Sequence, residues 1–246
     1  MSQPPLVTLI AGPTASGKSA LALKMARETG AVIINADSQQ LYADLRILTA
    51  RPTVEEEAQA DHRLYGVADA ADAWSVGRWS RAAIELLAAL EAEDRPAILV
   101  GGTGLYFTAL TKGLADIPTV PPNVRNAVEA DFVEKGEVTF RDALAGVDPK
   151  AASTIEKGDR LVRAMSVYVS SGRAISDWQA DTLPLLKSGA WTGIVIEPDR
   201  QRLYEKCDRR VDTMLENNVL DEVRTLIARQ LPSSLPAMKA VGIREL

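Results

Sequence analysis

Along the N-terminal part of the chain, short apolar runs alternate with segments whose apolar positions have helical spacing. Three short apolar runs, at residues 7–11, 31–36 and 96–100, predict buried β-strands. Between them, residues 20–29 and 76–91 carry apolar side chains at helical spacing, which predicts helices. Strands that alternate with helices are typical of a parallel α/β sheet with helices on its faces, and such sheets bind ligands at the carboxyl ends of their strands.

The pattern changes near residue 118, where the segment PTVPPN interrupts the alternation. Beyond it the pattern is mainly helical and contains no convincing strand until the β-rich run WTGIVIEP at residues 191–198. We therefore expect an α/β core of residues 1–117 and 189–246, with a helical insertion at residues 118–188. The helices predicted in this part of the chain are residues 122–135, 138–145, 160–171, 200–216 and 220–229.

A glycine-rich loop follows the first predicted strand. Its sequence, GPTASGKS at residues 12–19, fits the P-loop pattern of Gly, four residues, Gly, Lys, and Ser or Thr. A strand, such a loop and a helix start aim several backbone N–H groups at one point, which favours an anion there. Lys18 would reach the outer phosphate oxygens, and the hydroxyl of Ser19 would bind the accompanying magnesium ion. The loop is therefore predicted to hold a diphosphate or triphosphate.

Composition narrows the classes of protein to consider. The 246 residues are 46% hydrophobic and 25% charged, as in an ordinary soluble globular protein. The longest uncharged run, residues 96–111, is too short to span a bilayer, and no basic segment precedes the first apolar run as in a secretory signal. The single cysteine, Cys207, excludes an internal disulfide and a cysteine-based zinc site. We expect a cytoplasmic protein without a membrane span.

Net charge and histidine content exclude fewer classes of function. A net charge of −5 does not indicate a nucleic-acid binder, although an acidic chain can carry a local basic groove. The single histidine, His62, argues against a histidine-based metal site or catalytic triad.

Asp37 directly follows the second predicted strand, at the edge where a ligand is expected. From the residues alone it could order a magnesium ion, act as a general base, or cap a following helix. The polar residues that follow this aspartate favour a binding pocket over a simple connecting loop. These residues are Ser38, Gln39, Gln40, Thr49 and Arg51.

Five segments resemble the tRNA dimethylallyltransferases, also called tRNA isopentenyltransferases, in their order and spacing. They are GPTASGKS, NADSQQLYADLRILTARP, DHRLYGV, LVGGTGLYF and GDRLVRAMSVYVSSGR, and the likeness runs from about Leu6 to Arg244. These enzymes transfer a dimethylallyl group from its diphosphate to N6 of adenosine 37, on the 3′ side of the tRNA anticodon. The resemblance thus implies that the P-loop grips the diphosphate of an isoprenoid donor, which leaves as diphosphate.

The same resemblance implies roles for individual residues. Asp37 matches the base that accepts the N6 proton, Arg210 matches an arginine on the diphosphate, and Thr103 matches a tRNA contact near the target base, so these three form the expected catalytic set. The donor loop comprises Gly12, Pro13, Thr14, Ala15, Ser16, Gly17, Lys18 and Ser19, with Ser19 as the magnesium ligand. The tRNA contacts are Asp37, Ser38, Gln39, Gln40, Thr103, Arg125, Arg160 and Arg163.

Three alternatives stay open beside this interpretation. They are an ATP-dependent P-loop kinase, a non-catalytic nucleotide-binding module, and an adenylate isopentenyltransferase that acts on a free nucleotide. The helical insertion with its matched arginines favours tRNA, through the resemblance. We expect a monomer that uses Mg²⁺, dimethylallyl diphosphate and the anticodon stem-loop of tRNA. The family also continues with further helices beyond the segment VGIREL at residues 241–246.

Overall fold

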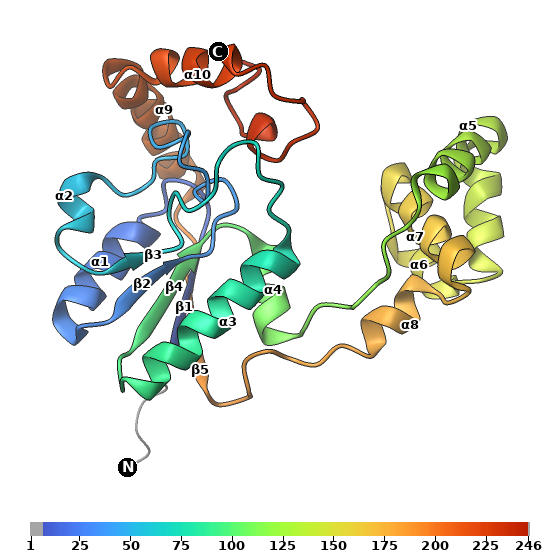
Figure 1. The fold of residues 1–246 in the computed structure, drawn as a ribbon, viewed down its shortest axis with the longest axis horizontal. Coiled ribbons are helices and arrows are strands. Elements are labelled where there is room, and N and C mark those ends of the chain that lie inside the picture. Colours follow the sequence, from blue (N-terminus) through green and yellow to red (C-terminus); the bar gives the residue numbers. More distant parts are fainter. Residues whose placement is uncertain (1–6, 246) are drawn as a thin grey trace. The chain divides into compact units, whose positions relative to one another are not determined.

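The computed structural model describes residues 7–245, which divide into two compact units (Figure 1). The first unit extends to Thr111 and resumes at Leu185, and the second comprises Lys112–Pro184. The helical unit thus begins and ends several residues before the insertion expected from the sequence, residues 118–188. The chain leaves the first unit directly after one helix and re-enters it before a strand, as an insertion does.

A five-stranded sheet forms the centre of the first unit, in the order β3-β2-β4-β1-β5. Every neighbouring pair of strands is parallel, so all five carboxyl ends lie at one edge. The predicted α/β class is confirmed, and so are four strands; the fifth, β3, has only two residues and shows no period. The strands are β1 (Val7–Ala11), β2 (Val32–Asn35), β3 (His62–Arg63), β4 (Ala97–Gly101) and β5 (Trp191–Val195).

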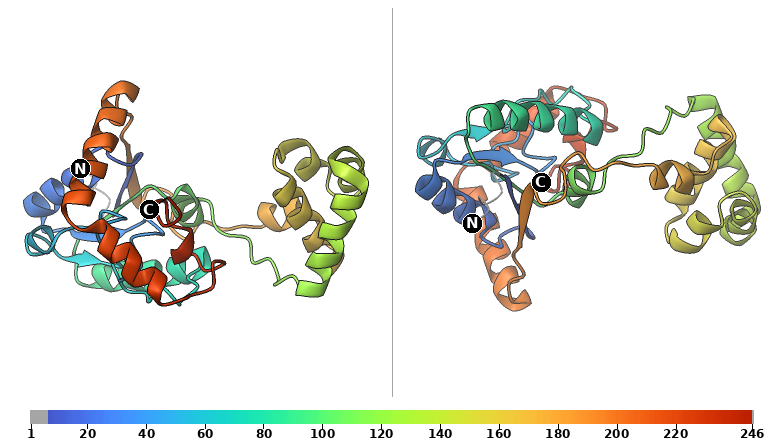
Figure 2. Two further views of the ribbon diagram at one scale, coloured as in Figure 1. Left: turned by 90° about the horizontal axis from the view of Figure 1, so that it is seen from above. Right: turned by 90° about the horizontal axis from the view of Figure 1, so that it is seen from below.

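Helices cover both faces of this sheet, as Figure 2 shows. Alternate strand residues point to opposite faces: Ile33 and Ile98 share a core with residues of α1, whereas Ile34 and Leu99 belong to the core to which α3 and α10 contribute. None of the helices in the described part of the chain has the length and apolar character needed to cross a membrane. The helical elements are α1 (Lys18–Thr29), α2 (Val54–Glu57), α3 (Val76–Ala92), α4 (Gly104–Thr111), α9 (Arg200–Glu216), α10 (Val219–Ala228) and the 3₁₀ helix η1 (Ala237–Lys239).

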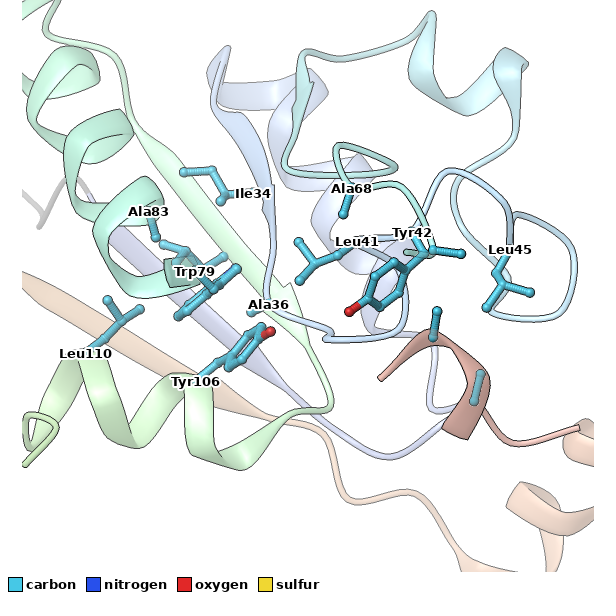
Figure 3. Packing of buried hydrophobic residues seen from close by; sticks show 14 of the residues in the cluster. Ile34, Ala36, Leu41, Tyr42, Leu45, Ala68, Trp79, Ala83, Tyr106 and Leu110 are labelled. Carbon is cyan, nitrogen blue, oxygen red and sulfur yellow. The ribbon is translucent and has the colours of Figure 1, made fainter. Parts of the chain in front are cut away.

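The core beneath α3 anchors the end of β2 (Figure 3). Trp79 is fully buried, and its ring stacks on that of Tyr106 with the centroids 4.0 Å apart. The indole Nε1 of Trp79 donates a hydrogen bond of 2.9 Å to the carbonyl oxygen of Asn35, the last residue of β2. This bond satisfies the buried indole N–H and ties the strand end to α3.

The second unit is a bundle of four helices around its own apolar core. Phe140, Leu144 and Leu161 are fully buried there. Two of the predicted helices form one element, α5, whose backbone breaks at Gly136 (φ 73°, ψ 163°), so the sequence prediction of two segments is confirmed. The short α6 and α8 escaped prediction. The helices are α5 (Pro122–Ala145), α6 (Pro149–Thr154), α7 (Gly158–Ser171) and α8 (Ile175–Ala180).

Asp148 joins two of these short helices. It is buried, and its carboxylate accepts the N–H of Ala151 in α6 (2.9 Å) and the N–H of Ser176 in α8 (3.0 Å). Burial acts to raise the pKa of this carboxyl, but the hydrogen bonds from Ala151, Ser176 and Ile175 outweigh it, so the pKa lies below its ordinary value.

The stability of the second unit should therefore depend on pH through Asp148. Because its pKa is lower in the folded chain than the value of about 3.9 in an unfolded chain, ionisation stabilises the fold above that value. This contribution is lost as pH falls through the lowered folded-state pKa. We expect Asp148→Asn to lower the free energy of unfolding at pH 7 by about 1–2 kcal/mol and to flatten its acid dependence. Urea unfolding at several pH values checks this, with the exposed Asp177→Asn as control. Equal losses in the two variants would contradict it.

Candidate active site

The glycine-rich loop connects β1 to α1, as expected from the sequence. The helix begins directly after Gly17, and the N–H of Leu21 already bonds to the Gly17 carbonyl (3.1 Å). The first turn of α1 contains no acidic side chain. Its free backbone N–H groups and the positive end of the helix dipole therefore face the loop without competition, which suits a bound anion.

Lys18 lies within this loop rather than extending into solvent. Its Nζ donates a hydrogen bond of 3.1 Å to the Pro13 carbonyl oxygen. Burial lowers the pKa of the Lys18 ammonium, while the charge of Asp37 raises it and that of Arg210 lowers it. Ser16 is also buried, and its Oγ has no hydrogen-bond partner within residues 7–245. A buried hydroxyl and an ammonium beside free N–H groups fit a phosphate ligand.

Asp37 follows β2 and is held by its own neighbours. Its backbone N–H bonds to the side-chain Oδ1 of Asn35 (2.8 Å), and its Oδ1 accepts the N–H of Gln39 (3.0 Å). Of the three roles left open for Asp37, that of a helix cap is excluded, since the next described helix begins at Val54 and is capped by Thr53. The side chain instead closes a short turn of its own.

Three strand ends converge on the Asp37 carboxylate. Thr103 follows β4, where its Oγ1 accepts the N–H of Ser38 (3.0 Å) and its N–H bonds to the Ala36 carbonyl (3.4 Å). A Cβ atom placed on Gly102 would lie 3.6 Å from both Asp37 Oδ2 and the carbonyl oxygen of Gly12 in the P-loop. The carboxylate therefore lies between the loop after β4 and the phosphate loop.

Arg210 reaches the same place from α9. Burial lowers the pKa of its guanidinium, and the nearby Cys207 and the Asp37 carboxylate act to raise it. Arg210, Lys18 and Asp37 thus lie within electrostatic range of one another. Two cations and one carboxylate leave a net positive charge, which an anionic ligand would balance.

Gln39 and Gln40 follow Asp37 in the chain, and their side chains have different hydrogen-bonding surroundings. The Nε2 of Gln40 donates to the carbonyl oxygens of Thr49 (2.8 Å) and Ala50 (3.0 Å). The Oε1 of Gln39 is buried and lacks a partner in the part of the chain that the structure describes.

The three arginines expected to contact tRNA belong to the second unit. Arg125 lies on α5, and Arg160 and Arg163 lie one turn apart on α7. All three residues are exposed.

Asn35 is a site residue that the sequence interpretation missed. It is fully buried, and its Nδ2 donates to the carbonyl oxygens of Asp37 (2.9 Å) and Leu64 (3.0 Å), while its Oδ1 holds the Asp37 N–H. The signal was a single amide inside the apolar run AVIINA. A buried amide needs partners, so it organises the backbone around it.

Known proteins match this chain over nearly its whole length. A family model described as IPP transferase matches residues 40–246. The tRNA dimethylallyltransferase of Caulobacter sp. (strain K31) is 56% identical over 242 residues, covering 98% of this chain and 78% of the relative. That of Phenylobacterium zucineum (strain HLK1) is 55% identical over 243 residues, with the same coverage, 98% and 78%.

Solved structures match as well. The full-length tRNA isopentenylpyrophosphate transferase from Bacillus halodurans has a TM-score of 0.65 and 28% identity, covering 97% of this chain and 75% of its own. A eukaryotic dimethylallyltransferase acting on tRNA has a TM-score of 0.76 and 24% identity, covering 91% of this chain and 56% of its own. The second likeness is one of fold alone.

The contact between the ends of β2 and β4 leaves no room for a side chain on Gly101. A Cβ there would lie 2.0 Å from the Ala36 carbonyl oxygen and 2.8 Å from the Asp37 nitrogen. We expect Gly101→Ala to push these strand ends apart and to lower the free energy of unfolding by about 1–3 kcal/mol.

Gly104→Ala is the matched control in the same loop. A Cβ on Gly104 meets no heavy atom within 4 Å, and this residue begins α4. Its substitution should be neutral or stabilising by up to about 1 kcal/mol. Urea unfolding followed by circular dichroism measures both variants, and equal stability of the two would contradict the steric argument.

Proposed function

Because the chain belongs to the IPP transferase family, we propose that it is a tRNA dimethylallyltransferase. It transfers the dimethylallyl group from dimethylallyl diphosphate to N6 of adenosine 37 in tRNA and releases diphosphate. One observation carries this proposal: the phosphate loop, Lys18, Arg210 and Asp37 converge at the carboxyl ends of β1, β2 and β4. The identity above 50% to proteins named tRNA dimethylallyltransferase supports it.

The positive groups of the site act on the donor. As the allylic C–O bond breaks, its electron pair leaves with the diphosphate and negative charge builds on the departing oxygens. Three positive groups are positioned to stabilise that charge before the reaction begins: Lys18, Arg210 and the backbone N–H groups at the start of α1. Preorganised donors of this kind stabilise a developing anion more than water does.

Asp37 acts on the acceptor. The N6 amine of adenine is a weak nucleophile because its lone pair is delocalised into the ring, so removal of its proton assists formation of the C–N bond. The Oδ1 of Asp37 already accepts the N–H of Gln39, which leaves Oδ2 to take the N6 proton. The transfer then balances: one C–N bond forms, one C–O bond breaks, and one proton moves to the carboxylate.

The residues also fit a magnesium ion bound with the donor. Ser19 is exposed at the start of α1, and no group of three or more His, Cys, Asp or Glu side chains among residues 7–245 could hold a metal by itself. The ligands would then be the Ser19 hydroxyl, diphosphate oxygens and water, a set that Mg²⁺ commonly takes. When bound, the ion would neutralise part of the diphosphate charge.

We assign the tRNA contacts to both units. The first unit supplies Asp37 to Gln40 and Thr103 around the target base, and the second supplies Arg125, Arg160 and Arg163. An anticodon-loop base is already outside a duplex, so moving it into the site costs less than extruding it from a helix. We further propose that the protein acts as a monomer in the cytoplasm.

Incubation with unmodified tRNA and radiolabelled dimethylallyl diphosphate tests the function. Label should enter tRNA and not free AMP or ATP, which serve as controls. Label in AMP alone would show that the acceptor is a free nucleotide and not tRNA. In the absence of any transfer, stronger thermal stabilisation by ATP than by the isoprenoid diphosphate would favour a kinase.

Removal of either donor-binding cation should weaken use of the donor selectively. We expect Lys18→Ala and Arg210→Ala to raise the KM for dimethylallyl diphosphate about tenfold or more, because each loses a charge-assisted contact. The dissociation constant for tRNA should change less than about twofold. Lys24→Ala on α1 and Arg209→Ala on α9 are matched controls, since both side chains are exposed. Loss of tRNA binding with normal donor use would refute the assignment.

Asp37→Asn separates a base from a metal ligand. The amide keeps the size of the side chain but cannot accept the N6 proton, so the single-turnover rate at saturating tRNA should fall by ~10² to 10⁴. Donor affinity and the magnesium dependence should stay nearly unchanged. Near-normal turnover, or rescue of the variant by excess magnesium, would remove Asp37 from the role of base.

A further inference from the structure

The loop of residues 43–51 has almost no regular structure, so its backbone N–H groups depend on other partners. One side chain far along the sequence, Glu222 of α10, supplies a partner for three consecutive donors. Its carboxylate accepts the N–H groups of Arg46 (2.8 Å), Ile47 (2.8 Å) and Leu48 (2.9 Å). A carboxylate is the acceptor best suited to three N–H groups that point to one place.

Hydrogen bonds connect the residues held by Glu222 to the Gln40 side chain through residues 49–51. The N–H of Ala50 bonds to the Ile47 carbonyl (3.0 Å), and the N–H of Arg51 bonds to the Arg46 carbonyl (3.0 Å), so the segment 46–51 is closed on itself. Gln40 in turn donates its side-chain Nε2 to the carbonyl oxygens of Thr49 and Ala50. A shift of residues 46–48 therefore moves the acceptors that orient the Gln40 amide.

A second charged contact holds α10 against the same region. Arg229, at the end of the helix, pairs with Asp44 and with Asp69 (2.6 Å to the latter). Asp44 also accepts the N–H of Ala70 (2.9 Å). Figure 1 shows α10 beside the loops that follow β2 and β3. The helix thus has one anchor near each of its ends, and Glu222 is the anchor directed at the loop that supports Gln40.

We infer that Glu222 is a positioning residue for tRNA. It holds residues 46–48, the adjoining Thr49 and Ala50 orient the Gln40 side chain through their carbonyl oxygens, and tRNA affinity depends on that arrangement although Glu222 itself is not required to touch the substrate. The inference rests on the proposed function. It predicts an effect on tRNA that the donor site does not share, because the Lys18 side chain is held within its own loop by the Pro13 carbonyl oxygen.

Glu222→Gln tests this with Asp221→Asn as the matched control. Glu222→Gln keeps the shape of the side chain but replaces one acceptor oxygen by a donor. The side chain of Asp221 is exposed and, within the described residues, pairs only with the neighbouring Arg224. Two measurements apply: amide hydrogen exchange across the chain, and steady-state transfer with tRNA and dimethylallyl diphosphate varied separately.

In Glu222→Gln, the amides of residues 46–48 should exchange faster while those of α1 and α3 keep their protection. The KM for tRNA should rise about tenfold, and the KM for dimethylallyl diphosphate should change less than about twofold. Glu222→Asp, which keeps the charge on a shorter side chain, should recover part of the loss. Asp221→Asn should leave both KM values within about twofold of the wild type.

Unchanged exchange at residues 46–48, or equal changes in both KM values, would overturn the inference. General loss of protection that includes α1 and α3 would also overturn it, because Glu222 would then serve global stability alone. Failure of the proposed function is distinguishable: the wild-type chain would then transfer no label to tRNA, whereas failure of this inference leaves an active wild type and a variant with normal tRNA kinetics.

Discussion

The parallel pairing of β1, β2 and β4 is the constraint on which the candidate site depends. In the β1–β4 pair Ala11 lies opposite Gly101, and β2 pairs with the other side of β4, so three strand ends meet at one edge of the sheet. The loops that leave these ends carry the P-loop, Asp37 and Thr103. The approach is close enough that only a residue without a side chain fits at Gly101. Strand pairing thus sets which groups meet.

Burial at this edge determines the electrostatics of the site. Lys18 and Arg210 are partly removed from water, which lowers the pKa of each, and the neighbouring Asp37 carboxylate offsets only part of this lowering. The two cations exceed the one carboxylate in charge, so an anionic ligand completes the balance. The same carboxylate stays beside the place where that ligand would bind. The proposed donor binding and the proposed proton acceptance would therefore share one small site.

The loop after β2 is held by charged contacts as well as by apolar packing. Apolar packing fixes β2 itself through Trp79, whose indole bonds to the Asn35 carbonyl. The loop beyond also packs Leu41, Tyr42 and Leu45 into the core. Its backbone donors and carboxylates are held in addition by charged groups of α10, chiefly Glu222 and Arg229. Hydrogen bonds of this kind are directional, and they place a loop more specifically than apolar contact does.

The sequence alone determined the α/β class, four of the five strands, the break at Gly136 and the phosphate loop, because each rests on local periodicity or local backbone geometry. The position of Asp37 at a strand end also followed from the pattern. Only the tertiary structure decided β3, whose two residues carry no period, and the role of Asn35, whose side chain joins Asp37 to Leu64 in the loop after β3. It also decided the contact of Glu222 with residues 46–48, which spans 174 to 176 positions. Contacts between distant segments depend on how the sheet and its helices pack, and no local pattern along the chain encodes them.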